Sequence, residues 1–210
     1  MSPDPTSTER REQIDPAHMG LLLNDLINAN LRKRDDPETN RRVAETDFVT
    51  SALQLVARLR PLHVPVFWVR VARRQDRADM PGNSVDSPSA WHTSTSPIVE
   101  GSYEASFLEE VDIAPEDQVI VKTRIDPFIG TDLDLQLRAR GVTTLAVGGY
   151  ATNVGVESCV RTAHDLGYDV VVLRDCCWNI RTEAHEASLR HNIPLFARVL
   201  TSSELLTLLV

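Results

Sequence analysis

The chain has 210 residues, of which 42% are hydrophobic and 25% charged, and its formal net charge is -8 at pH 7. This balance is typical of a soluble globular protein, and the length suits one α/β domain rather than two. The basic residues form only short patches, at residues 31–34 and 72–74, so a nucleic acid or an anionic membrane surface is disfavoured as a partner. Since no apolar stretch approaches the roughly 20 residues that span a bilayer, we expect no membrane helix.

The N-terminal sequence is polar, with prolines, charges of both signs and no apolar core of a signal peptide. We therefore expect residues 1–16 to form a disordered arm and residues 17–210 to form a single domain. The three cysteines, two of them adjacent, make a poor disulfide framework and are typical of a reducing compartment. Together these features predict a cytoplasmic protein.

Short apolar runs alternate with segments of helical periodicity along the chain. In chain order, the predicted strands lie at residues 18–25, 64–72, 118–123, 143–149, 168–175 and 196–201, the last being the weakest. The predicted helices lie at residues 40–61, 131–140, 153–166, 181–192 and 202–209. This alternation predicts an α/β protein with a mostly parallel six-stranded sheet and helices on both faces, a three-layer α/β/α architecture.

A long polar segment, rich in Pro, Gly and Ser, separates the second and third predicted strands at residues 73–102. Such segments inside compact domains are often lids or partner-binding loops. Trp91 within it is a candidate to contact a bound substrate or another subunit, with an ordinary surface aromatic as the alternative.

Three predicted strand ends carry groups suited to chemistry. Asp25 ends the first strand, Lys122 ends the third, and the turn GGYATNVG at residues 148–155 follows the fourth. Only Lys33 and Lys122 among the 22 basic residues are lysines. Ligands of parallel sheets bind at the carboxyl ends of the strands, so we expect these groups to share a site. The alternatives are a carboxylate that caps a helix and a lysine that reaches water at a sheet edge.

With these motifs in register, the chain resembles the isochorismatase-like hydrolase superfamily, also called the cysteine hydrolases, from about residue 18 to residue 209. The matching segments are LLLNDLIN at 21–28, VIVKTRIDPFIGTDLDLQLRARG at 119–141 and GGYATNVGVESCVRTAHDLGYDVVVLRD at 148–175. The resemblance implies a hydrolase of amides such as nicotinamide or N-carbamoylsarcosine, or of the enol ether of isochorismate. It also implies that Asp25 and Lys122 are two members of an Asp–Lys–Cys triad.

The third member of that triad is absent. The family motif G-x-A-T-x-x-C-V reads GYATNVGV here, which places Gly155 where the nucleophilic Cys belongs. Cys159, one helical turn later, is better explained as a small core residue than as a substitute nucleophile. Superfamily members with this Gly include isochorismatases that form no covalent intermediate. The resemblance therefore implies a thiol-independent reaction with Asp25 as general acid and Lys122 as the charge that orients it.

Candidate substrate-binding residues surround these positions. A dicarboxylate such as isochorismate needs cationic partners, for which Arg70, Arg73, Arg74 and Arg124 are available, Arg124 ranking first because it lies close to Lys122. The resemblance further implies Phe128, Tyr150 and Ala151, with a cis peptide bond between the last two. Ile27 and Ala151 depart from the Gln and the aromatic residue that isochorismatases usually carry, which leaves the substrate open.

The six histidines show no D-x-H, H-x-H or HExxH spacing, so we predict no metal and no cofactor. The resemblance implies a homodimer or homotetramer acting on a small molecule. Three functions remain: a thiol-independent hydrolase of a small carboxylated substrate, an amidohydrolase that uses Cys159, or a non-catalytic binder of small molecules.

Overall fold

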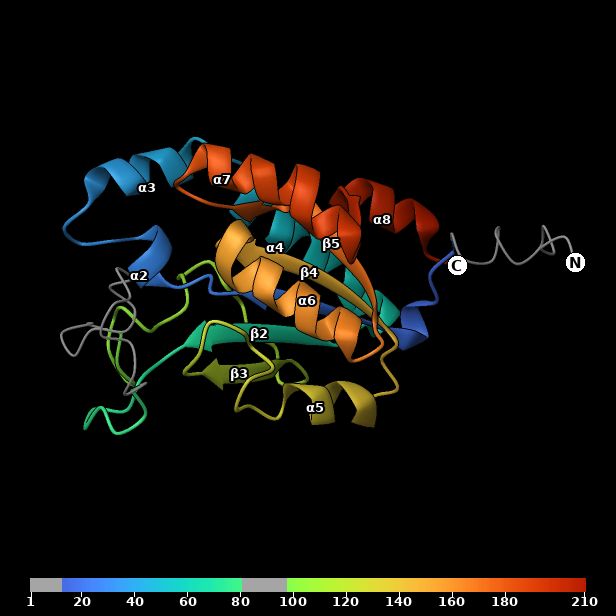
Figure 1. Cartoon of the computed structure of the whole chain (residues 1–210), viewed down its shortest axis with the longest axis horizontal. Helices are drawn as coiled ribbons and strands as arrows, with labels where there is room; N and C mark the ends of the chain where they lie inside the picture. The colour runs from blue at the N-terminus through green and yellow to red at the C-terminus, as the bar shows by residue number, and fades with distance from the viewer. Residues whose placement is uncertain (1–12, 81–97) are drawn as a thin grey trace, which may run out of the picture.

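The computed structural model of the chain describes residues 13–80 and 98–210 (Figure 1). Six strands form one sheet in the order β3-β2-β1-β4-β5-β6, and every neighbouring pair is parallel. The strands are β1 (Met19–Asn24), β2 (Val66–Val71), β3 (Gln118–Lys122), β4 (Thr144–Tyr150), β5 (Asp169–Trp178) and β6 (Arg198–Leu200). Each overlaps a predicted strand, so the predicted α/β class is confirmed.

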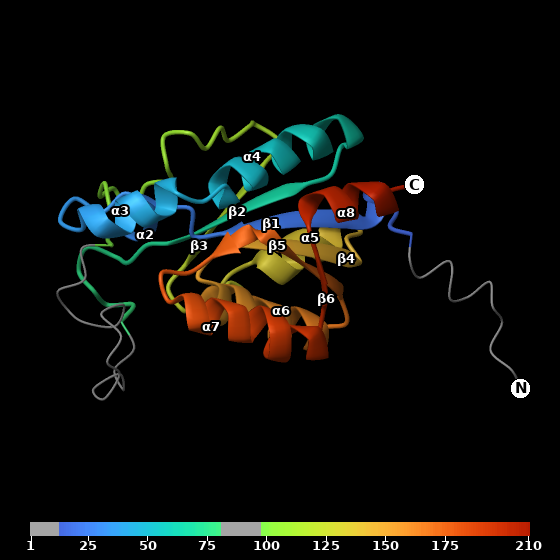
Figure 2. The ribbon, with the colours of Figure 1, turned by 90° about the horizontal axis from the view of Figure 1, so that it is seen from above.

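Helices cover both faces of this sheet (Figure 2). They are α2 (Asn28–Leu31), α3 (Pro37–Ala44), α4 (Phe48–Leu59), α5 (Leu133–Ala139), α6 (Glu157–Asp165), α7 (Thr182–Ala187) and α8 (Ser202–Leu208). Helices α4 and α8 share one core with one face of the sheet, and α5 and α6 share a second core with the other. Side chains alternate along a strand, so Leu21 and Leu23 enter the first core and Leu22 enters the second. Burial on both faces explains why β1 reads as a continuous apolar run.

The single helix predicted at residues 40–61 is wrong, because α3 and α4 are separate helices. The Thr46 hydroxyl donates a hydrogen bond of 2.8 Å to the Val43 carbonyl at the end of α3. Short polar side chains of this kind offer the backbone an alternative to continued helix. The chain then turns at Asp47 before α4 begins.

The N-terminal boundary also differs from the expected one. Ile14 is buried and its amide donates to the Leu208 carbonyl, so the folded region begins before residue 17, inside the predicted arm. Residues 1–12 of that arm lie outside the described residues. Within residues 13–80 and 98–210, no helix has the length and apolar character needed to cross a membrane.

Candidate active site

The candidate site lies where the sheet topology changes direction. Strand β1 pairs with β2 on one side and with β4 on the other, so the connections on its two sides run in opposite directions across the sheet. Such switch points leave a crevice at the carboxyl ends of the strands. Gly149 permits the close approach of β4 to β1 there, because its φ is +115° and a Cβ would lie 2.1 Å from the Asn24 carbonyl oxygen.

Asp25 follows β1 directly, and its hydrogen bonds connect the end of β1 to β2. Its amide donates to the Val69 carbonyl at 2.8 Å, and its carboxylate Oδ1 accepts from the Val71 amide at 2.9 Å. Its φ is 55°, in the left-handed region that Asp and Asn tolerate better than most residues. Non-glycine residues held in this conformation cluster at functional sites. The first carboxylate oxygen therefore holds the main chain of β2, and the second is left for other partners.

Lys122 supplies the partner of that second oxygen. Its ammonium Nζ lies 2.8 Å from Asp25 Oδ2, and it donates to Asn24 Oδ1 at 2.9 Å and to the Ile125 carbonyl at 2.8 Å. These contacts use the three donors of an ammonium group. Since only 2% of Lys122 is exposed, the alternative of a lysine that reaches water is wrong.

The environment of Asp25 shifts its acidity. Burial raises the pKa of the Asp25 carboxyl above its usual value, and the Lys122 charge and the hydrogen bonds from Lys122, Val71 and Asn24 oppose this rise only in part. A desolvated carboxyl with a raised pKa can hold a proton at a pH where an exposed one has lost it. This is the property that a general acid needs.

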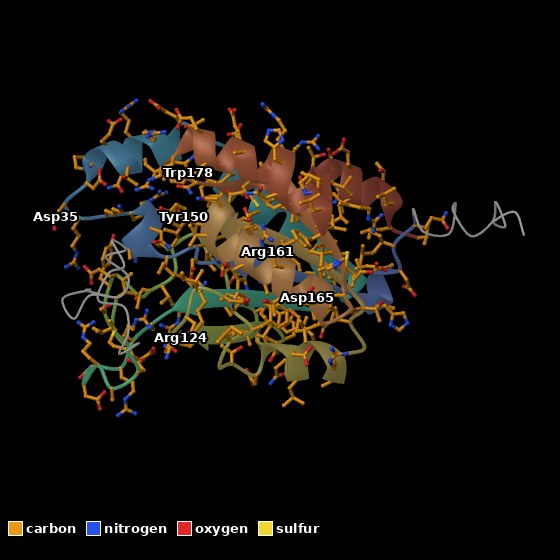
Figure 3. The ribbon with its side chains drawn as sticks, in the orientation of Figure 1. Asp35, Arg124, Tyr150, Arg161, Asp165 and Trp178 are labelled. Atoms are coloured by element: carbon orange, nitrogen blue, oxygen red, sulfur yellow. The ribbon has the colours of Figure 1, made fainter. Side chains whose placement is uncertain are left out.

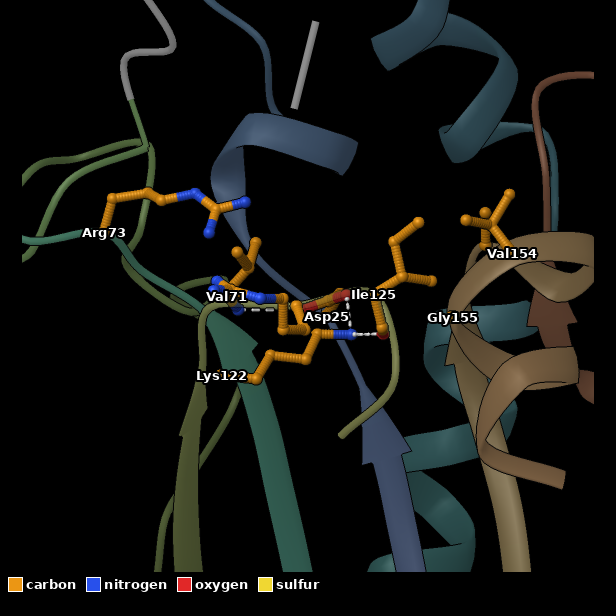
Figure 4. A pocket seen from close by; sticks show the side chains of 9 residues that line it. Asp25, Val71, Arg73, Lys122, Ile125, Val154 and Gly155 are labelled. Carbon is orange, nitrogen blue, oxygen red and sulfur yellow. Dashed lines mark hydrogen bonds and ion pairs between the residues drawn. The ribbon is translucent and has the colours of Figure 1, made fainter. Parts of the chain in front are cut away.

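A pocket opens above the ion pair (Figure 4). Its lining consists of Asp25, Val71, Arg73, Lys122, Arg124, Ile125, Ala151, Val154 and Gly155. Arg73 donates to the Thr123 carbonyl, and Arg124 donates to the same carbonyl and to that of Asp79. The lining thus combines three cationic side chains with one carboxylate. This charge balance favours an anionic ligand.

The structure brings together five of the predicted site residues, Asp25, Lys122, Arg124, Ala151 and Gly155, in this lining. The peptide bond between Tyr150 and Ala151 is cis, as the resemblance implies.

Two other predicted residues, Tyr150 and Phe128, lie outside this lining. The Tyr150 ring packs against Trp178, with ring centroids 5.8 Å apart (Figure 3). The Phe128 ring packs against Tyr168 at 6.2 Å beside the second core. Neither ring is part of the pocket lining. The Tyr150 ring packs in the first core, and the Phe128 ring packs against the second. Trp91 lies outside the described residues.

The cysteines lie in the interior. Cys159 is fully buried in the second core, and burial raises the pKa of its thiol. Cys176 and Cys177 are also buried, with raised thiol pKa values. A thiol of this kind is inert, because the thiolate is the nucleophilic form. In the described part of the chain, no three His, Cys, Asp or Glu side chains are grouped so as to hold a metal ion.

The sequence predictions missed Asn24 as a site residue and ranked Arg73 below Arg124. The sequence contains a feature that could have identified each of them. Asn24 is a polar residue that ends an apolar run directly before Asp25, and Arg73 follows the second predicted strand at the same edge of the sheet. Of the other two candidate arginines, Arg70 pairs with Glu100 and Arg74 with Asp76.

Comparison with known proteins identifies related chains. The isochorismatase domain model matches residues 20–204. An uncharacterized isochorismatase family protein of Escherichia coli O157:H7, YecD, is 36% identical over 198 residues, which cover 94% of this chain and 99% of that protein. A ureidoacrylate amidohydrolase of Methylobacterium radiotolerans, RutB, is 35% identical over 155 residues, 67% of this chain and 58% of that protein. The structure of an isochorismatase family protein from Burkholderia thailandensis superposes with a TM-score of 0.80 at 29% identity, covering 94% of this chain and 97% of that one.

Proposed function

The chain belongs to the isochorismatase family of hydrolases, and we propose that it cleaves a small carboxylated substrate by acid–base chemistry without a thiol nucleophile. The observation that carries this proposal is the buried Asp25–Lys122 pair beside Gly155. In the family motif, Gly155 stands where the nucleophilic Cys is found. With no side chain at this position and Cys159 buried in the core, Asp25 is the group best suited to transfer a proton.

Hydrolysis of an enol ether fits these groups. Asp25 gives a proton to the terminal vinyl carbon, which leaves an oxocarbenium ion. Water adds to the oxocarbenium carbon, a proton returns to the carboxylate, and the adduct collapses to pyruvate and an alcohol. Lys122 keeps the carboxyl in place throughout, and Arg73 and Arg124 hold the carboxylate groups of the substrate. Isochorismate has this chemistry and is the first substrate to test.

The assay measures pyruvate release from isochorismate by the wild-type chain and by the Asp25→Asn variant. Consumption of ureidoacrylate is followed in parallel, because a related chain carries that activity in its name. Pyruvate release that depends on Asp25 supports the proposal. If neither compound is consumed while isochorismate raises the melting temperature, the chain is a binder and the proposal fails.

Turnover is expected to survive alkylation with iodoacetamide, because the three cysteines are buried and Gly155 offers no thiol. The native protein is treated at pH 8 and assayed for pyruvate release. The Cys159→Ala variant serves as the matched control and is expected to keep wild-type turnover. Loss of activity in both experiments would assign the chemistry to Cys159.

Arg124→Gln is expected to raise KM by roughly 10- to 100-fold, since a hydrogen bond to a charged group contributes about 1.5–3 kcal/mol. Arg140→Gln, which changes an exposed arginine at the C-terminal end of α5, outside the pocket lining, is the matched control. Steady-state kinetics of both variants measure the effect. An unchanged KM in Arg124→Gln would exclude this guanidinium from substrate binding.

A further inference from the structure

The side chain of Asn24 fills the space beside Gly155. A Cβ added at Gly155 would lie 2.3 Å from Asn24 Nδ2 and 3.4 Å from Lys122 Nζ. The first distance is shorter than any contact that a Cβ tolerates, so a side chain at position 155 requires Asn24 to move. Figure 4 shows Gly155 together with Asp25 and Lys122 among the residues that line the pocket.

Asn24 is held in this place by hydrogen bonds at both ends of its amide. Its Oδ1 accepts from Lys122 Nζ at 2.9 Å. Its Nδ2 donates to the Tyr150 carbonyl at 2.7 Å and to Asp25 Oδ2 at 3.2 Å. The residue is fully buried. A buried amide whose partners are satisfied cannot move away without leaving polar groups unpaired. This costs more free energy than the same movement at a solvent-exposed site, where water replaces the lost partners.

These contacts connect Asn24 to both members of the proposed acid–base pair. The amide touches the Lys122 ammonium on one side and the Asp25 carboxylate on the other, in the space that a side chain at position 155 would need. The Asn24 amide is not a nucleophile. From this space it can orient Asp25 and Lys122, but it cannot attack a substrate.

We infer that Asn24 is a positioning residue that replaces a side chain at position 155, orients Asp25 and Lys122 from that space, and excludes a thiol nucleophile while it is present. This inference deepens the proposed function and depends on it for the reaction, but its geometry is testable without any substrate. It predicts that Asn24 and Gly155 are coupled, so that substituting one changes what the other position tolerates.

The first test introduces a cysteine at position 155. Gly155→Cys alone is expected to lower the melting temperature by about 3 to 10 °C, because overpacking a rigid site is destabilising. In the Asn24→Ala background, the same substitution is expected to cost at most half as much, because the amide that a Cβ would meet is absent. The new thiol should react with iodoacetamide roughly tenfold faster in the double variant than in the single one, as measured by mass spectrometry of the modified peptide.

Asn28 offers the matched control. It is also a buried asparagine, but its amide donates to the Tyr103 carbonyl at 3.0 Å, away from Gly155. In the Asn28→Ala background, Gly155→Cys is expected to cost as much as in the wild type. A Gly155→Cys variant with wild-type stability, or an equally reduced cost in both asparagine backgrounds, would overturn the inference.

The second test asks whether Asn24 orients Asp25 rather than merely filling space. Asn24→Leu keeps the branched shape of the side chain but removes the hydrogen bond to Asp25 Oδ2 and the acceptor of Lys122. The Asp25 carboxyl, followed by the chemical shift of its carboxyl carbon, is expected to titrate at a higher pH than in the wild type. Lys122, whose charge acts on this carboxyl, is retained, and so are Arg73 and Arg124 in the pocket lining.

Asn28→Leu is expected to leave the Asp25 titration unchanged. An unchanged titration in Asn24→Leu would show that the residue is only a space filler and would refute the positioning role. Neither test uses a substrate, so a result that refutes the role of Asn24 is distinguishable from a failure to find turnover.

Discussion

Asp25→Asn is expected to lower kcat for isochorismate by about 10²- to 10⁴-fold, the usual contribution of a positioned general acid. An amide at this position still accepts the hydrogen bond from the Val71 amide but has no proton of suitable acidity to give. Pyruvate release under saturating substrate measures the effect. A variant that keeps more than about a third of wild-type turnover would remove Asp25 from the proton transfer.

Asp175→Asn is the matched control for this substitution. Asp175 also lies on a strand of the sheet, but its carboxylate accepts from the amide and hydroxyl of Ser202 at 2.8 and 2.6 Å and does not line the pocket. We expect this variant to keep wild-type turnover. A comparable loss in both variants would indicate a general effect on the fold.

The pH dependence of the wild-type reaction follows from the same carboxyl. Burial raises the pKa of Asp25, so its protonated form persists to a higher pH than that of an exposed aspartate. A general acid acts in its protonated form, and kcat/KM should therefore fall as the pH rises through the raised pKa. A rate that increases over this range would indicate that the ionised carboxylate is the active form.

Lys122→Met is expected to lower the free energy of unfolding by about 3–5 kcal/mol at pH 8, because removing one partner of a buried ion pair leaves the other charge uncompensated. Methionine fills the space of the lysine stem but offers nothing to Asp25 Oδ2, Asn24 or the Ile125 carbonyl. Urea denaturation measures the loss. Lys33→Met is the matched control, since the Lys33–Asp36 pair is partly exposed to solvent and its loss is expected to leave the urea midpoint nearly unchanged.

The stability of Lys122→Met should depend on pH in a defined direction. Without the ammonium, the pKa of Asp25 in the folded state rises further above its value in the unfolded chain. The folded state then binds a proton more tightly, so stability is retained below the unfolded pKa of about 4 and falls as the pH rises through the folded pKa. Lys122→Met/Asp25→Asn removes both charges and should regain part of the loss at pH 8. A deficit independent of pH would indicate lost packing rather than an unpaired charge.

The family fold and two of the site residues follow from local sequence features. Continuous apolar runs predict strands buried on both faces, and parallel strands place their carboxyl ends at one edge of the sheet. This rule alone brings Asp25 and Lys122 together, although the two residues are far apart in the chain. The glycine at position 155 is likewise readable without a structure.

The remaining features depend on packing between distant segments. Phe128 and the Tyr150 ring cover core surface that no local pattern reveals, and the break between α3 and α4 depends on a hydrogen bond from Thr46. Among the candidate arginines, Arg70 and Arg74 meet carboxylates, whereas Arg73 enters the pocket. These outcomes are decided by which partner each long side chain reaches, and that is a tertiary property.

Strand periodicity and strand ends are local features, and they suffice to predict the α/β sheet, the edge at which the candidate site lies, and the Asp25, Lys122 and Gly155 positions. What stands beside Gly155 depends instead on how distant segments pack. Asn24 comes from β1 and Gly155 from the short π-helix η4 (Thr152–Val156) that follows β4. Their contact exists because β1 and β4 are neighbours at the switch point of the sheet. Gly155 leaves a space that the Asn24 side chain fills, and this arrangement exists only in the folded protein.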